Sequence, residues 1–213
     1  TNCGACNAIC LAQESCYKGK CALLSTAGGS LDDRATDVDI DANGNIYVLG
    51  TFFTTTTFGT LKLTSAGSTD VFLAKYNSAG TLLWAKQFGG TGEDRAGTLQ
   101  VGPQQNIYIT GSFKNTAKFG PTSLKSSGDF DIFASKISSS GNLLWIKKAG
   151  GTGFDLGVDL ALDVDPNGKG VCYIVGQYSA TATFGTTQLT SAGSQDVFVA
   201  RLSATNGSFS WTQ

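Results

Sequence analysis

The sequence contains one pattern three times, and this repetition restricts the possible folds more than any other feature of its 213 residues. A glycine pair recurs at a constant step of 61 residues, at Gly28-Gly29, Gly89-Gly90 and Gly150-Gly151. One tryptophan closes each copy, at Trp84, Trp145 and Trp211. Self-similarity at a fixed period of this length indicates an array of supersecondary units, each of which buries its apolar surface against its neighbours.

Within each copy, apolar and polar residues alternate with a period of two, which is typical of β-strands. Residues 36–41 place Val38 and Ile40 between polar side chains, and Asn43-Gly44 follows as a turn suited to a type I′ hairpin. Two more such segments flank the turn at residues 77–80. Each copy is therefore expected to form four antiparallel strands in up-and-down order. The longer segment between the second and third strands is expected to add a short β-ribbon.

Four antiparallel strands repeated around an axis form a β-propeller blade. The predicted fold class is all-β, with three four-stranded propeller-type blades after a small disulfide-rich N-terminal segment. The expected boundaries are 1–25 for the Cys-rich segment, 26–88 for blade 1, 89–149 for blade 2 and 150–213 for blade 3. A linear β-solenoid is the alternative, but its coils usually recur at a shorter spacing.

Three blades are fewer than the four to eight of an ordinary closed propeller. An open arc would leave two apolar blade faces in water, which soluble monomers avoid. We therefore expect either further blades of a longer chain or self-association of separate chains. Head-to-tail contacts that close would give a ring, and contacts that do not close would give filaments.

The composition excludes several classes of function. The chain has no histidine, which removes the commonest general base near neutral pH and the commonest metal ligand. Its net charge of −1 and lack of a basic run argue against nucleic acid as a partner. No apolar run approaches the roughly 20 residues that span a bilayer. The sequence therefore predicts a protein that is not an enzyme and has no membrane span.

Five of the six cysteines crowd the N-terminus, at Cys3, Cys6, Cys10, Cys16 and Cys21. So short a segment cannot bury enough apolar surface to fold unaided, and disulfides are the usual remedy. A metal cluster is the rival interpretation, but only the first two cysteines have CxxC spacing. Because five is odd, one cysteine needs Cys172 or a cysteine outside this chain as its partner. Either pairing implies an oxidising compartment, and therefore a secreted or cell-surface protein.

Two turns resemble the opening of a calcium loop, in which alternating oxygens face the ion. The candidate ligands are Asp39, Asp41 and Asn43 in copy one and Asp163, Asp165 and Asn167 in copy three. The acid that should complete each loop at its twelfth position is missing, since Gly50 and Ile174 stand there. A hairpin turn is therefore favoured, with calcium as the alternative and no other cofactor expected.

Two further residue sets recur at equivalent positions in each copy. Acids follow each glycine pair at Asp33, Asp94 and Asp155, where short acids commonly accept hydrogen bonds from backbone amides of their own loop. The aromatic set is Phe72, Trp84, Phe133, Trp145, Phe198 and Trp211. Their constant place favours packing between blades. The alternatives are a polar ligand bound by the acids at a shared central face and sugar platforms made by the aromatic rings.

Both parts of the chain resemble known bacterial repeats. Residues 39–52, "DIDANGNIYVLGTF", with the later strands "DVFLAKY" and "TLLWAKQF", resemble the β-propeller repeat called SBBP. The resemblance covers residues 28–213, and copy two departs from it where Gln replaces the Asn-Gly turn. It implies a secreted or cell-surface propeller, without one assigned activity.

The N-terminal residues "NCGACNAIC" and "CYKGKC" resemble the Cys-rich disulfide repeats of secreted and surface proteins of myxobacteria, with Asn7 in place of the usual glycine. Members of that family usually carry a further cysteine upstream, so this resemblance implies an N-terminal segment before Thr1.

The function expected from these observations is that of a non-catalytic, extracellular structural or adhesive repeat protein. It would act through self-assembly, as a filament or surface-layer subunit, or through recognition of a cell-surface partner. The alternative is a lectin-like propeller that binds glycans at one site per blade. A hydrolase or lyase is the least favoured class, because three equivalent acids do not provide the two carboxyl groups in different environments that a glycosidase needs.

Overall fold

The structure is a computed structural model that describes residues 2–3, 8–9, 14–17, 20–23 and 26–213, with side chains described from residue 26 onward. Two short antiparallel pairs lie in the Cys-rich segment. They are β1 (Asn2–Cys3) with β2 (Ala8–Ile9), and β3 (Glu14–Tyr17) with β4 (Lys20–Leu23). The predicted disulfides of this segment lie outside the described side chains and stay a prediction.

Residues 33–212 form three successive four-stranded antiparallel units, as the alternating pattern predicts. Unit 1 comprises β6 (Asp33–Ile40), β7 (Ile46–Phe58), β8 (Leu61–Tyr76) and β9 (Leu82–Gly90). Unit 2 comprises β10 (Asp94–Val101), β11 (Ile107–Phe119), β12 (Thr122–Ile137) and β13 (Leu143–Gly151). Unit 3 comprises β14 (Leu156–Val164), β15 (Gly170–Tyr178), β18 (Asp196–Ser203) and β19 (Phe209–Thr212). The predicted all-β class with antiparallel sheets is confirmed.

The turn between the first two strands is built differently in unit 2. Gly44 and Gly168 supply a left-handed residue in units 1 and 3, with φ of 78° and 75°. Unit 2 has no glycine there, and a short 3₁₀ turn, η2 (Pro103–Gln105), takes its place. Gln104 and Gln105 adopt φ of 60° and 57°, so a backbone conformation that normally favours glycine is kept without one.

The predicted ribbon is present and joins neighbouring units. In units 1 and 2 it is the far end of the second and third strands, and in unit 3 it is β16 (Thr181–Phe184) with β17 (Thr187–Thr190). Each ribbon pairs with the last strand of the preceding unit, β11 with β9 and β16 with β13. The short strand β5 (Ala27–Gly28) takes this place beside unit 1.

These ribbon contacts explain why the glycine pair repeats. A Cβ at Gly90 would overlap the carbonyl oxygen of Thr116, and one at Gly151 would overlap that of Thr181. Gly29 has the same relation to Thr55. The pair therefore ends one unit and lets the ribbon of the next approach its backbone, so the hydrogen bonds of β9 run past the boundary expected at residue 88.

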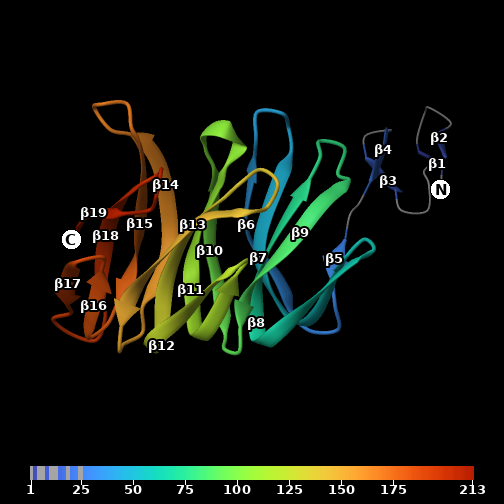
Figure 1. Ribbon diagram of the computed structural model, residues 1–213. Helices are drawn as coiled ribbons and strands as arrows, with labels where there is room; N and C mark the ends of the chain where they lie inside the picture. The colour runs from blue at the N-terminus through green and yellow to red at the C-terminus, as the bar shows by residue number, and fades with distance from the viewer. Residues whose placement is uncertain (1, 4–7, 10–13, 18–19, 24–25) are drawn as a thin grey trace.

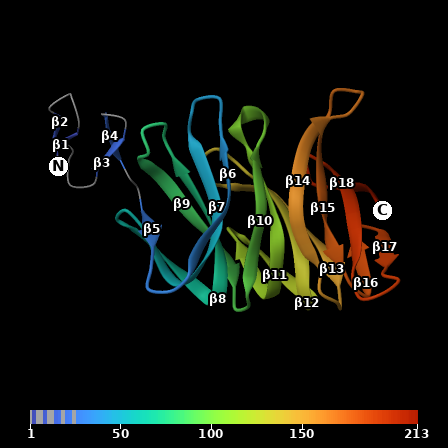
Figure 2. The same cartoon turned by 180° about the vertical axis from the view of Figure 1, so that it is seen from behind.

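The units stand side by side in an open row, with unit 1 and unit 3 at opposite ends (Figures 1 and 2). The first strands β6, β10 and β14 are neighbours along one side of the row. Two large hydrophobic clusters lie at the junctions between units, each built from residues of both. A smaller cluster contains residues of unit 1 alone. Among the described residues, no helix is long and apolar enough to cross a membrane.

Candidate functional site at the ends of the array

The junction between units 1 and 2 centres on one backbone carbonyl. The indole Nε1 of Trp84 donates to the carbonyl oxygen of Ser139 at 3.2 Å, and Lys75 Nζ donates to the same oxygen at 3.3 Å. Tyr47 lies against both, with its ring 6.2 Å from that of Trp84 and 4.9 Å from the ammonium of Lys75. Ser139 belongs to the turn between the last two strands of unit 2. Side chains of unit 1 therefore bind a turn of unit 2 through this carbonyl.

The same arrangement recurs between units 2 and 3. Trp145 Nε1, Lys136 Nζ and Tyr108 OH donate to the carbonyl oxygen of Ala204, at 3.2, 3.1 and 3.3 Å. The repeated tryptophan is thus an anchor between units. Sequence reasoning selected the tryptophans but missed the tyrosine and the lysine. Both recur at the repeat spacing, as Tyr173 and Arg201 in unit 3, which is the signal that would have found them.

We expect the value of this anchor to depend on whether a next unit covers it. Trp145→Phe removes the indole donor at a buried carbonyl and should lower the free energy of unfolding by about 1–2 kcal/mol. Trp211→Phe, at the same repeat position but 41% exposed in the single chain, should change it by less than about 0.5 kcal/mol at a concentration at which the chain is monomeric. Urea unfolding followed by circular dichroism measures both. Equal losses in the two variants would contradict the anchor.

Two buried carboxylates face each other at the first junction. A Cβ at Gly89 would lie 2.6 Å from both Asp70 Cγ and Asp94 Oδ2, so the absent side chain leaves the space between the two acids. Asp94 Oδ2 accepts the Gly90 N–H at 2.7 Å, and Asp70 Oδ2 accepts from Gln87 Nε2 at 2.5 Å. Asp70 Oδ1 is buried without a hydrogen-bond partner. Burial, and then the Asp70 charge, raise the pKa of Asp94 to about 7, and burial also raises the pKa of Asp70.

The second junction repeats this pair with an added cation. A Cβ at Gly150 would lie 2.9 Å from Asp131 Oδ1 and 2.8 Å from Asp155 Oδ2. Lys148, at the position of Gln87, places its ammonium 2.8 Å from Asp131 Oδ2. Burial and the charge of Asp131 raise the pKa of Asp155 to about 6.

The predicted loop acids share one local role. Asp33, Asp94 and Asp155 each accept the N–H of the second glycine of the pair before them, at 2.5, 2.7 and 2.7 Å. Asp94 and Asp155 lie at the two junctions and Asp33 lies on the outward face of unit 1, so the three acids do not form one central site.

The calcium-like loops use their acids as turn formers. Asp41 Oδ1 accepts the N–H groups of Asn43 and Asn45, and its Oδ2 accepts from Asn45 Nδ2 and Tyr47 OH. Asp165 Oδ1 likewise accepts from Asn167 and Lys169. In the part of the chain that the structure describes, no group of three or more His, Cys, Asp or Glu side chains could hold a metal ion. This geometry favours the turn interpretation.

The remaining two acids of these loops have different roles. Asp39 Oδ2 accepts the N–H of Val101 in unit 2 at 2.7 Å, so it links the first strands of two units. Asp163 Oδ1 accepts the N–H of its own neighbour Val164.

Cys172 has a free thiol on β15 and is 1% exposed. It stands where unit 2 has Ile107, also buried, and acts there as a small apolar side chain in the cluster of the second junction. Burial raises the pKa of this thiol to about 12. Which cysteine completes the odd set in the N-terminal segment stays open.

The outward face of unit 3 carries exposed apolar residues that are buried in units 1 and 2. Val197 is 70% exposed, whereas Val71, at the same register in unit 1, is 0% exposed. Val199 and Trp211 are exposed on the same unit. Each counterpart in units 1 and 2 packs against the following unit. The array thus presents at this end a face built for contact between units.

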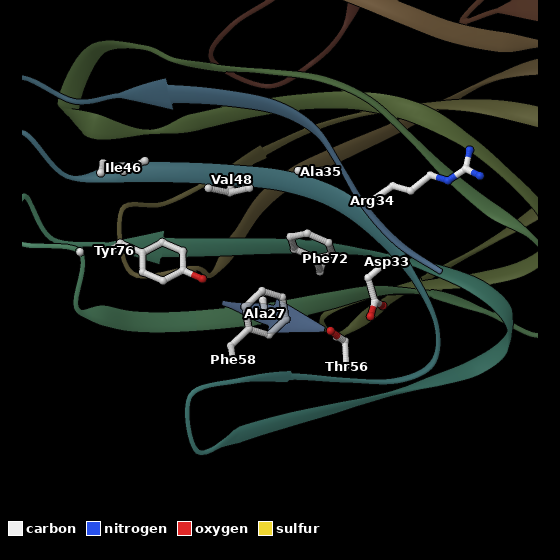
Figure 3. Close-up of a pocket in the computed structure, with 11 residues that line it drawn as sticks. Ala27, Asp33, Arg34, Ala35, Ile46, Val48, Thr56, Phe58, Phe72 and Tyr76 are labelled. Carbon is white, nitrogen blue, oxygen red and sulfur yellow. The ribbon is translucent and has the colours of Figure 1, made fainter. Parts of the chain in front are cut away.

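The outward face of unit 1 holds an open apolar groove of about 370 Å³. Figure 3 shows the rings of Phe58, Phe72 and Tyr76 bordering it, with Val48 beside them and Asp33 at one end. Val38 is 59% exposed on unit 1, whereas its counterpart Leu99 is 4% exposed because it packs in the junction with unit 1. The predicted packing residue Phe72 thus borders a groove, while Phe133 and Phe198 are covered.

Comparison with known proteins gives one distant relative, and no protein-family model matches the chain. An uncharacterized WD repeat-containing protein of Acanthamoeba polyphaga mimivirus is 26% identical over 143 residues, which is 59% of this chain and 10% of the relative. The chain therefore spans about a tenth of that protein's length. WD repeats are propeller repeats of four-stranded units. With its antiparallel all-β units, the chain is a β-propeller-like repeat protein.

Proposed function

We propose that the chain is a non-catalytic, extracellular structural repeat protein whose three units are propeller blades of the SBBP type and which works through assembly. One observation carries this proposal: the side chains that join one unit to the next are repeated on the two outward faces of the array. The similarity to a WD repeat-containing protein supports the repeat architecture on which this proposal depends.

The repeated polar residues support a structural role over a catalytic one. Asp94 and Asp155 are fully buried, and the second glycine of each pair donates to them. Catalytic carboxyl groups must instead reach a substrate. The glycan-binding alternative is supported less, because Phe133 and Phe198 are buried and Trp211 is the only tryptophan among the described residues with an exposed side chain.

The native mass of the purified chain tests assembly. We expect sedimentation and electron microscopy to show rings or filaments heavier than the 22.1 kDa chain, because the exposed faces repeat an interface that is apolar elsewhere. A monodisperse 22.1 kDa species at all concentrations would reject the proposal. Binding to a glycan array without assembly would favour the lectin alternative.

The proposed extracellular location has its own test. An oxidising compartment should leave four of the five N-terminal cysteines paired with one another, the fifth paired with a cysteine outside this chain, and the buried Cys172 reduced. Peptide mapping of the non-reduced protein by mass spectrometry identifies these pairs. Five free N-terminal thiols in protein isolated from its native source would contradict both the Cys-rich repeat and secretion.

A further inference from the structure

Each hydrophobic cluster at a junction has one half from each of two units. In the first junction, Tyr47, Leu49, Val71 and Leu73 of unit 1 meet Ile109, Phe119 and Phe133 of unit 2. The cluster on the outward face of unit 1 holds Phe52, Phe58 and Phe72, which are counterparts of Phe113, Phe119 and Phe133 in the unit 2 half. The outward face of unit 1 is therefore one half of a junction. The groove of Figure 3 corresponds to the space that the preceding unit fills at the two junctions within the chain.

The missing half has the composition of the outward face of unit 3. Tyr173, Val197 and Val199 stand at the register of Tyr47, Val71 and Leu73. Trp211 pairs with Arg201 across β18 and β19, as Trp84 pairs with Lys75 in unit 1. We propose that the unit 3 face of one copy docks on the unit 1 face of a second copy, head to tail, and this rests on the assembly proposed above.

The anchor residues fit this docking. Arg201 now donates to Ser210 Oγ at 3.0 Å and lies 3.5 Å from Asp165. In the docked pair it and Trp211 reach the turn at residues 77–80 of the second copy, where Ser78 stands at the position of Ser139. Asp196 and Asp33 would face each other as Asp70 and Asp94 do, because they occupy the same two registers.

The end strands of the two faces occupy different positions along one strand line. Trp211 of β19 stands at the position of Trp84, and Ala27 of β5 stands at that of Phe88, four residues further along the last strand. In the docked pair, β19 of one copy and β5 of the other therefore lie end to end along one strand line and do not compete for it.

One contact is lost in this docking. Gln100 Oε1 accepts the N–H of Leu162 in the next unit at 2.9 Å, and Asp39 has the same role in unit 1. Unit 3 has Ala161 at this position, which offers no side-chain oxygen. The contact between copies is therefore carried by the apolar faces and the tryptophan anchor.

Two copies supply six blades, which lies within the four to eight of closed propellers, so a closed dimer is the expected species.

Charged substitutions on each face test the docking. Val197→Asp and Val38→Asp place a carboxylate on the unit 3 face and the unit 1 face, where both side chains are exposed in the single chain. Each should weaken self-association at least about 100-fold, because the charge is buried only in the docked pair. At a concentration low enough for the parent to be monomeric, neither substitution should change the melting temperature. Leu144→Asp is the matched control, since Leu144 is 52% exposed on β13 and lies on neither end face. Analytical ultracentrifugation measures the masses.

Mixing the two variants separates head-to-tail docking from other modes of assembly. Val197→Asp keeps an intact unit 1 face and Val38→Asp keeps an intact unit 3 face, so an equimolar mixture should form a two-copy complex that neither variant forms alone. A parent chain that associates while neither substitution weakens it would overturn this docking and leave the assembly function standing. Weakening by only one substitution would indicate a symmetric contact and also overturn it. A parent that stays monomeric would overturn both.

Discussion

Replacement of Gly90 by valine should lower the free energy of unfolding by at least about 3 kcal/mol, because the new side chain meets backbone and not a flexible side chain. A Cβ at this position would overlap the carbonyl oxygen of Thr116. Thr116 lies in the ribbon part of β11, which pairs with β9. The structure can relieve the overlap only by separating the two strands, which opens the junction between units 1 and 2. Urea unfolding followed by tryptophan fluorescence measures the loss.

The chain supplies a matched control for this substitution. Gly193 lies in the ribbon loop of unit 3, and a Cβ there would meet no atom within 4 Å. Gly193→Val should therefore change the free energy of unfolding of the monomeric chain by less than about 0.5 kcal/mol. In units 1 and 2 the same position, Gly67 and Gly128, lies against the backbone of the segment that leads to the following unit, at Thr91 and Thr152. A Gly90→Val protein as stable as the Gly193→Val protein would show that the glycine pair is not needed for the approach of the ribbon.

Much of this architecture could be predicted from the sequence because it is local. The period of two fixed the strands, and the Asn-Gly turn after Ile40 fixed the first hairpin, since both depend on residues a few positions apart. The positions of Trp84 and Trp145 at constant spacing were enough to place them between units. Copy two keeps its hairpin although Gln104 replaces a favoured turn residue, because the paired strands on either side impose the left-handed backbone.

The features that escaped prediction are set by contacts between different copies. Asp70 and Asp94 are 24 residues apart and belong to different units, so nothing in either local pattern indicates that they share one buried space. The ribbon was predicted, but its pairing with the preceding unit, and hence the reason for Gly90, follows only from how units stack. Residues at equivalent repeat positions look alike in the sequence. The arrangement of the units in the structure is needed to see that Trp145 is covered by the next unit whereas Trp211 is exposed.

The free energy of unfolding should fall as the pH rises from about 4 to 7. Asp94 keeps a proton in the folded chain up to a pKa of about 7, and Asp155 up to about 6, whereas both lose it near 3.8 when unfolded. A group whose pKa is raised by folding stabilises the folded state below the unfolded pKa, and this contribution is lost as the pH passes the folded pKa. At 1.36 kcal/mol per pKa unit, the losses are on the order of 4 kcal/mol for Asp94 and 3 kcal/mol for Asp155.

A carboxyl group whose pKa is lowered by folding determines the pH below which stability falls again. Although burial of Asp41 opposes its ionisation, hydrogen bonds from Asn45, Asn43 and Tyr47 lower its pKa. Its stabilising contribution is therefore present above pH 3.8 and is lost as the pH falls further. Glu93 adds a smaller repulsion at Asp94, and Lys148 offsets the charge of Asp131 beside Asp155. Stability should thus be greatest at about pH 4–5, below the pH 5–8 typical of folded proteins.

Asp94→Asn isolates the contribution of the first pair. An asparagine cannot ionise, and its amide oxygen can still accept the Gly90 N–H. The variant should therefore be more stable than the parent at pH 8, and its loss of stability between pH 5 and 8 should be smaller. Asp33→Asn, at the same loop position on the outward face of unit 1, is the matched control and should not raise the stability at pH 8 when both variants are measured as monomers. Urea unfolding at each pH gives the free energies, and an equal slope in the parent and in Asp94→Asn would show that folding does not raise the pKa of Asp94.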